Sequence, residues 1–422
     1  MTRARFARYF PLIIFLLCCI AELSLVAILT DLPISVGNWQ GKSRELLRLS
    51  FPTSNFYGPG GAILILPFLW SGPSFIVPVF FYFTIGCIGF FLLSRKIENK
   101  TIRIISLALI PANPYLIWLC YSSQDTVFEF ALLTWSMYFL HNKKWISYTL
   151  VAFLLAETRA GYWTLFLGLG LTLLFVDLYR KQNLNWRKYL AMPLLIITLG
   201  SNWILYNSPS PALEGGMTAY FSYSKYQYLA LPKMDMDVFL SGDKGIFSEG
   251  YGPMIPLDAS EAEANEVFQK AAIDSVMANP KETLLALMQK FESYFIGVQK
   301  VPHLPGAYVL NQDSNSIEIG DERLRWSLIL GNLLYEFYRS SLVLCGLLGL
   351  GGLLFAKRIG AVETYSQLKL KVLAAPWIFG AAPALLFYTE TRFKVVSETL
   401  LFLFILEIWS VLLKARKPEK IK

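Results

Sequence analysis

The same charged triplet occurs twice in this very apolar chain. Glu157-Thr158-Arg159 and Glu390-Thr391-Arg392 each follow a long hydrophobic run, and a second hydrophobic run follows each of them. The arginine guanidinium is a planar fork that binds phosphate oxygens, and a nearby carboxylate either holds that fork in place or accepts a proton. These residue types indicate a site for an anionic ligand, provided that the fold brings the triplets together.

Other charges occupy similar places at the ends of apolar segments. Asp31 closes the first segment, and Asp125 opens a later one, with Glu129 one helical turn further along on the same side. Lys394 and Glu398 lie one turn apart at the start of the last segment. A lone charge at the centre of a membrane helix costs about 2.5–3.5 kcal/mol on insertion scales, so charges at matching depth are expected to pair or to line a wet cavity. Considered alone, each charged residue could also be a helix-end side chain that extends to the lipid head groups and has no further role.

Composition predicts an all-α polytopic membrane protein. The chain has 422 residues, of which 55% are hydrophobic and 16% charged, and its mean hydropathy is +0.46. A soluble domain carries about 25% charged residues. The net charge of +8 does not indicate nucleic-acid binding, because the basic residues form short clusters between apolar blocks, which is the positive-inside pattern.

Counting these basic clusters gives a topology of about ten crossings with both termini in the cytoplasm. The first crossing covers 10–30 and is expected to remain uncleaved. The other expected crossings are 73–94, 103–120, 126–140, 146–157, 162–178, 189–206, 338–356, 371–388 and 395–413. The chain then divides into an N-terminal membrane region (1–206, with a first outer loop at 31–72), an extracytoplasmic loop domain (207–325) and a C-terminal membrane region (326–422).

The loop domain is expected to be helical. Residues 260–297 read as two amphipathic helices that break at Asn279-Pro280, and Ser260 with Glu263 forms a capping box for the first. In the first outer loop, 38–51 reads as a helix that lies in the membrane interface and carries Glu45. The sharp turn Tyr57–Gly61 follows, and then a short re-entrant run, Ala62–Trp70.

The cysteines and histidines of the sequence show no spacing typical of a metal site, a disulfide framework or a reactive thiol. The five cysteines all lie within apolar segments, without metal-binding spacing or a disulfide framework. The two histidines, His141 and His303, stand apart, so neither is expected to be catalytic.

Several motifs together resemble the bacterial members of the GT-C glycosyltransferases, in particular the protein-mannosyltransferase-like enzymes that use polyprenyl-phosphate sugars. The resemblance extends over almost the whole chain. Its motifs are Asp31, Tyr57–Gly60, Asn113–Asp125, Glu157–Gly161, Phe268–Phe291 and Glu390–Val396.

The resemblance implies a donor sugar on a polyprenyl phosphate in the membrane and an outward-facing active site in a bacterial inner membrane. Asp31 would be the general base that activates a glycolipid, polysaccharide or protein acceptor, and transfer would invert the anomeric configuration. Arg392 and then Arg159 would hold the lipid phosphate. Glu157, Glu390, Tyr57, Lys394 and Glu129 complete the expected substrate-binding residues. No cofactor is assigned, and a divalent cation stays open, because its use varies within the fold and no ligand set is evident.

One departure from the family concerns the base. The family places its aspartate about four residues before an aromatic residue, whereas the first aromatic residue after Asp31 is Trp39. Glu45 and Asp125 are the alternative bases.

Two other functions stay open at this stage. A ligase or polymerase of lipid-linked glycans would use the same charges. A transporter or flippase is less consistent with the sequence, because no paired halves are visible and the charges cluster at one face.

Overall fold

The computed structural model of the protein describes residues 3–30, 37–48, 59–71, 76–122, 124–181, 184–206, 215–223, 259–295, 308–311, 316–319, 322–358, 368–386 and 394–415. The helices of these segments are α1 (Arg3–Thr30), α2 (Gly37–Leu47), α3 (Gly60–Ile65), η1 (Leu66–Ser71), α4 (Ile76–Ser94), α5 (Lys100–Leu107), α6 (Pro114–Ser122), α7 (Gln124–His141), α8 (Trp145–Thr158), α9 (Tyr162–Tyr179), η2 (Trp186–Tyr189), α10 (Ala191–Tyr206), α11 (Gly215–Tyr223), α14 (Glu261–Ala278), α15 (Pro280–Phe295), α16 (Glu322–Arg358), η3 (Lys371–Ala374), α17 (Ala375–Leu386) and α18 (Val395–Ala415).

Five of these helices are long and apolar enough to cross a membrane, as expected of a helical membrane protein. They cover Phe10–Ile28, Ile76–Ser94, Tyr162–Tyr179, Leu333–Phe355 and Val395–Lys414. The other expected crossings are shorter apolar helices, apart from two. The segment 103–120 divides into α5 and α6, and α7 carries too many polar residues to meet the same criterion. The count of ten crossings therefore stays a prediction.

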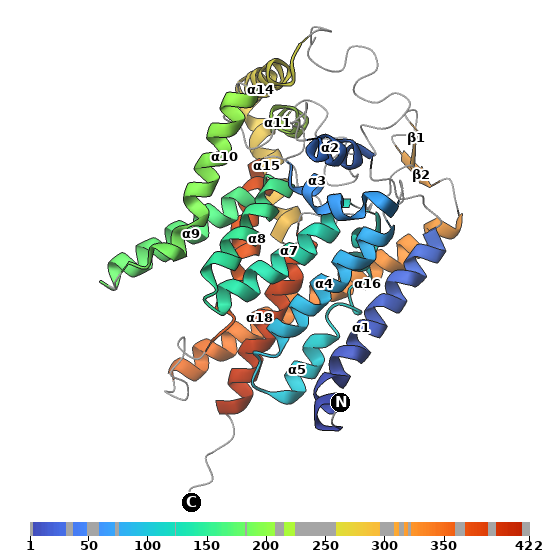
Figure 1. Ribbon diagram of the computed structural model, residues 1–422, viewed down its shortest axis with the longest axis vertical. Helices are drawn as coiled ribbons and strands as arrows, with labels where there is room; N and C mark the ends of the chain where they lie inside the picture. The colour runs from blue at the N-terminus through green and yellow to red at the C-terminus, as the bar shows by residue number, and fades with distance from the viewer. Residues whose placement is uncertain are drawn as a thin grey trace, which may run out of the picture.

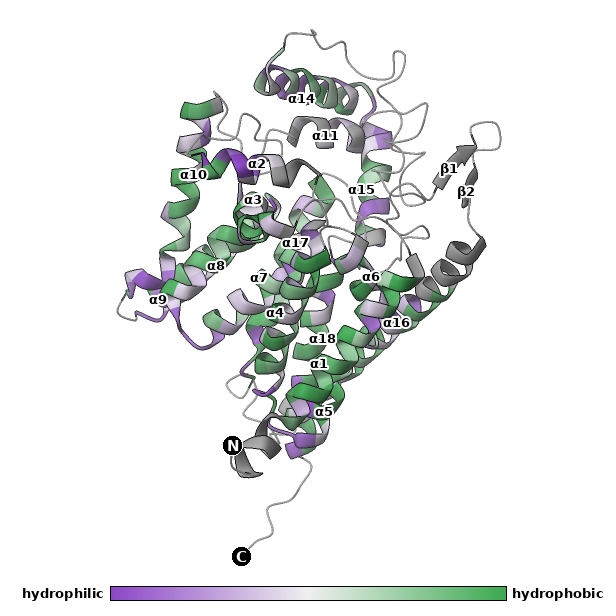
Figure 2. Cartoon of the chain, turned by 45° about the vertical axis from the view of Figure 1, so that its right-hand side comes forward, coloured by the Kyte–Doolittle hydropathy of each residue, from purple (hydrophilic) through white to green (hydrophobic). Residues whose placement is uncertain are grey.

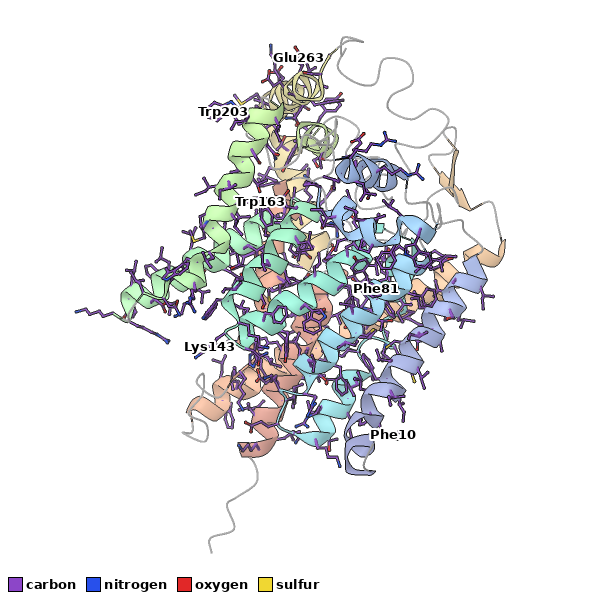
Figure 3. All side chains as sticks on the ribbon, viewed as in Figure 1. Phe10, Phe81, Lys143, Trp163, Trp203 and Glu263 are labelled. Carbon is purple, nitrogen blue, oxygen red and sulfur yellow. The ribbon has the colours of Figure 1, made fainter. Side chains whose placement is uncertain are left out.

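The two ends of the helical bundle differ in character. The start of α1 and the end of α18 lie at one end, whereas α2, α11 and α14 lie at the other (Figure 1). Hydrophobic residues cover α4 and α8, and polar residues are frequent on α2 and α14 (Figure 2). Phe10 and Trp163 lie towards opposite ends (Figure 3). This arrangement agrees with the expected placement of the loop helices at the end opposite the chain termini.

Helices α4 and α7 pack closely, because glycines of α4 admit side chains of α7. A Cβ added at Gly86 would stand 2.4 Å from the ring of Phe130, and one at Gly89 would stand 2.8 Å from the Thr134 hydroxyl. The Thr134 hydroxyl also bonds back to the Phe130 carbonyl at 2.8 Å. In a lipid environment the hydrophobic effect does not drive helices together, so close van der Waals packing at small residues does. The contact between α4 and α7 is therefore expected to be a major stabilising contact of the bundle.

The loop domain has the two expected helices. Ser260 and Glu263 form the predicted capping box of α14, and Asn279 ends this helix immediately before Pro280 begins α15. The structure also contains an element that the all-α prediction missed. β1 (Tyr308–Asn311) pairs antiparallel with β2 (Ser316–Ile319), with Tyr308 opposite Ile319. Four-residue strands give too short an alternation to be recognised in the sequence.

At the end of the bundle that carries the termini, an ion cluster joins three segments. Glu98 binds Lys369 at 2.7 Å and Lys414 at 3.0 Å, and these hydrogen bonds lower the pKa of the Glu98 carboxyl to about 2. Glu407 accepts the backbone N–H groups of Lys369 and Leu370, each at 2.7 Å. The start of α17 is thereby fixed against α18.

We predict that Gly86→Ala destabilises the protein by about 1–3 kcal/mol, because the added methyl group overlaps the buried Phe130 ring. The matched control is Gly200→Ala in α10, where an added Cβ meets nothing within 4 Å. Denaturation of the purified variants in detergent micelles measures both effects. Equal stability of the two variants would contradict the packing described for α4 and α7.

Candidate functional site

A buried ion cluster joins α7 to the turn between α8 and α9. Arg159 Nη2 lies 3.3 Å from Asp125 Oδ2, and Arg159 Nη1 pairs with Glu129 Oε2. The Tyr162 hydroxyl donates to the other oxygen of Glu129. The side chains of Arg159, Glu129 and Asp125 are 11%, 1% and 29% exposed. One arginine thus faces two carboxylates, of which Asp125 is the more accessible.

Local sequence explains why these groups meet. Asp125 and Glu129 lie one turn apart at the start of α7, so both carboxylates point to one face of that helix. Arg159 is the C-cap of α8, in extended conformation, and the N–H of Tyr162 returns to the Arg159 carbonyl at 3.0 Å. The tight turn therefore places the arginine and the tyrosine side by side against the two acids.

The first residue of the triplet is directed elsewhere. Glu157 is buried, and its Oε1 accepts a hydrogen bond from Thr198 of α10 at 2.8 Å. Residues two positions apart at a helix end point to different sides, so Glu157 joins α8 to α10 while Arg159 joins α8 to α7. The triplet thus connects α8 to two neighbouring helices, α7 and α10.

The beginning of α3 packs directly on this triplet. A Cβ added at Gly60 would stand 2.5 Å from the backbone nitrogen of Thr158 and 2.7 Å from the carbonyl carbon of Glu157. Only a residue without a side chain admits this approach. The turn predicted around Tyr57–Gly61 thus leads into a helix that lies against the ion cluster, although Tyr57 itself is outside the described residues.

A second buried cluster joins α16, α18 and α15. Arg339 Nη2 lies 3.0 Å from Glu398 Oε1 and donates to the Tyr294 carbonyl at 3.1 Å. The Tyr335 hydroxyl donates to Glu398 Oε2 at 2.5 Å. Lys394 Nζ reaches the same Tyr294 carbonyl at 3.4 Å. Two cations thus meet at the C-terminal turn of α15, next to Glu398.

The two clusters are neighbours. The Tyr162 hydroxyl of the first lies close enough to Tyr294 of the second for an electrostatic interaction between them. α17 packs on α9, α15 and α18, and the Thr164 hydroxyl contacts the Phe379 carbonyl at 3.4 Å. The Tyr294 hydroxyl in turn donates to the Trp377 carbonyl at 2.7 Å. α17 is therefore next to both clusters, since it contacts α9 of the first and α15 and α18 of the second.

Lys290 is a further cation near the second cluster, one helical turn before Tyr294 on α15. Its side chain is buried, and its Nζ lies 3.8 Å from the centre of the Tyr223 ring. Burial lowers the pKa of Lys290 to about 7, because the charged form loses hydration. The ring of Tyr223 offsets part of that cost through a cation–π contact.

The structure brings several of the predicted residues together. Asp125, Glu129 and Arg159 form one cluster, and Lys394 joins the adjacent one. Glu45 lies further along, on α2, which packs on α3 through the 2.7 Å bond from the Ser43 hydroxyl to the Ala62 carbonyl. The predicted residues outside the described part of the chain are Asp31, Tyr57, Glu390 and Arg392, and His303 is outside it as well.

Sequence reasoning missed four members of the clusters. Tyr162, Tyr294, Tyr335 and Arg339 each bond to a charged group, and none was among the predicted site residues. Arg339 carried a usable signal, because it stands inside the expected crossing 338–356, where a charge is costly unless it has a function. The three tyrosines carried no such signal, because nothing in the sequence distinguishes them from the other tyrosines of the chain, which has 22 in total.

Comparison with known proteins adds no assignment. No protein-family model, no curated protein and no solved structure matches this chain. Among the described residues, no group of three or more His, Cys, Asp or Glu side chains could hold a metal ion.

Glu129→Gln should destabilise the protein by about 3–5 kcal/mol, because it leaves a buried arginine short of one carboxylate. Asp125→Asn should cost at most about 1 kcal/mol, because Asp125 is partly exposed. Denaturation in detergent micelles measures the difference. A loss for Asp125→Asn as large as that for Glu129→Gln would contradict the assignment of Glu129 as the main partner.

Lys290→Met should stabilise the protein by about 1–3 kcal/mol at pH 7, because no buried ammonium has to lose its hydration. In the native chain, the lysine is neutral when folded and charged when unfolded between pH 7 and 10.5, so the free energy of unfolding rises with pH across this window. Lys290→Met removes that rise, whereas Lys281→Met, at an exposed position of the same helix, keeps it. An unchanged pH dependence in Lys290→Met would contradict the burial of this charge.

Proposed function

We propose that this protein is a membrane glycosyltransferase of the GT-C type, which transfers a sugar from a polyprenyl phosphate to an acceptor outside the cytoplasm. In this proposal, the shorter apolar helices complete about ten crossings of a bacterial inner membrane. Both termini are cytoplasmic, and the charged clusters face the periplasm or the outside.

The observation that carries the proposal is the meeting of buried charges near one end of an apolar bundle. Asp125, Glu129 and Arg159 belong to one cluster, and Lys394 with Arg339 to its neighbour. Buried charges are costly in a membrane protein and are usually retained for function. A donor with an anionic phosphate and a polar sugar, held by an apolar lipid tail, matches a polar centre inside an apolar bundle.

The proposed reaction is a single displacement. Asp31 removes the proton of an acceptor hydroxyl, whose oxygen attacks the anomeric carbon of the donor sugar. The bond from that carbon to the phosphate oxygen breaks, and the polyprenyl phosphate leaves with the electron pair. Arg392 stabilises the charge on the phosphate and Arg159 assists it in this proposal; Asp125 and Glu129 hold the Arg159 guanidinium in place. The substrate-binding roles of Glu157, Glu390, Tyr57 and Lys394 belong to the same proposal, with Glu45 and Asp125 as alternative bases.

Loss of the gene product should remove a sugar from the cell-surface glycans, and complementation with Asp31→Asn should not restore it. Mass spectrometry of the surface glycans measures the sugar. The purified Asp31→Asn variant should still bind a polyprenyl-phosphate sugar, because a general base acts in the reaction step.

The matched control is Glu98→Gln, since this carboxylate is exposed and pairs with Lys414 in the last turn of α18. It should complement fully. Normal turnover by Asp31→Asn would transfer the base role to another carboxylate, and unchanged glycans after loss of the protein would contradict the proposed function.

A further inference from the structure

Arg339 is buried with part of its hydrogen-bonding capacity unused. Its side chain is 4% exposed, and both of its interactions, with Glu398 and with the Tyr294 carbonyl, use Nη2. Among the described residues, its Nε and Nη1 have no hydrogen-bond partner. A buried donor without a partner costs about 1–3 kcal/mol and more when it is charged, so these N–H groups call for an acceptor.

The surroundings of Arg339 favour an anion as that acceptor. Lys394 bonds to the same Tyr294 carbonyl, so a second cation stands beside the guanidinium. The indole of Trp377 packs on Tyr294 with ring centres 6.1 Å apart, and its N–H is likewise without a partner among the described residues. Hydrogen-bond donors and positive charge thus accumulate around the last turn of α15.

The neighbouring arginine has the opposite environment. Arg159 is engaged by two carboxylates, Asp125 and Glu129, which already compensate its charge. Arg339 faces one carboxylate, Glu398, which also accepts a hydrogen bond from Tyr335. Of the two arginines, Arg339 is therefore the better equipped to bind an added anion.

The geometry of Arg339 is also rigid. Tyr335 stacks on Tyr115 with ring centres 4.9 Å apart, and it fixes Glu398, which in turn fixes one edge of the guanidinium. The unpaired Nε–H lies on the side edge of the planar fork and the unpaired Nη1 lies on its end edge, and each edge shares the engaged Nη2. Each of these N–H groups can donate a charge-assisted hydrogen bond to a phosphate oxygen.

We propose that Arg339, assisted by Lys394, forms a phosphate-binding site at the junction of α15, α16 and α18. The ligand class is a phosphate group, either as the ester of a lipid head group or as free inorganic phosphate. The inference rests on the proposed function only for the source of the phosphate, since the donors that define the site are present whatever reaction the protein catalyses.

Isothermal titration calorimetry on the full-length protein in phospholipid nanodiscs tests the site. The probes are inorganic phosphate, geranyl phosphate and geraniol, which has the same tail without a phosphate. Geranyl phosphate should bind and geraniol should not. Binding of inorganic phosphate as well would identify the anion alone as the ligand, whereas binding of geranyl phosphate alone would identify a lipid head group.

Arg339→Gln should weaken the binding of geranyl phosphate at least tenfold, which corresponds to about 1.4 kcal/mol. Arg339→Lys keeps the positive charge but not the planar fork, so it should lose an intermediate amount of affinity. This variant provides the test if Arg339→Gln does not fold. Lys281→Gln, at an exposed position of α15, should bind as the native protein does. Native affinity in both Arg339 variants, or equal binding of geraniol and geranyl phosphate, would overturn the proposal.

The outcome of this binding test can be distinguished from the outcome of the test of the glycosyltransferase proposal. If geranyl phosphate binds in an Arg339-dependent manner but loss of the protein leaves the surface glycans unchanged, the phosphate site stands and the proposed reaction fails. If the glycans change but Arg339→Gln binds geranyl phosphate normally, the reaction stands and this site fails.

Discussion

The pairing of Arg159 with Glu129 is the interaction on which the polar end of this bundle depends. Both groups are buried among apolar helices, where either charge alone would be strongly destabilising. Their partnership fixes the turn after α8 against α7, and Tyr162 bonds to the same carboxylate from the start of α9. Three helix ends are thereby held by one carboxylate, and the close approach of Gly60 adds α3 to them.

A second arrangement of the same kind holds the C-terminal half. Glu398 binds Arg339 and Tyr335 from α16, and the Tyr294 carbonyl receives both Arg339 and Lys394. Because α17 packs between the two arrangements, residues far apart in sequence meet in one polar region. Ionic groups that are costly in lipid thus act as the specific contacts among helices whose surfaces are otherwise similar.

Much of this organisation could be predicted from the sequence. The hydrophobic runs located the helices, the Ser260–Glu263 capping box and the break at Asn279-Pro280 fixed the loop helices, and the positions of Asp125, Glu129 and Arg159 at segment ends indicated that they would meet. Periodicity, caps and the cost of lone charges are local properties, so one sequence is enough to reveal them.

The rest depends on tertiary contacts that no local pattern encodes. The different directions of Glu157 and Arg159 follow from the positions of α10 and α7, and the place of Tyr294 beside Lys394 follows from the packing of α15 on α17. Pro111 and Pro114 lie where the segment 103–120 divides into two helices, although counting the basic clusters favoured one crossing.

A cryo-electron microscopy reconstruction of the protein in lipid nanodiscs, at a resolution that shows side chains, tests the central claim most directly. It should show Arg159 between Asp125 and Glu129, and Arg339 between Glu398 and the last turn of α15, in one polar region shielded from lipid. Density for lipid tails between these two groups, or either arginine directed away from its carboxylate, would contradict the account.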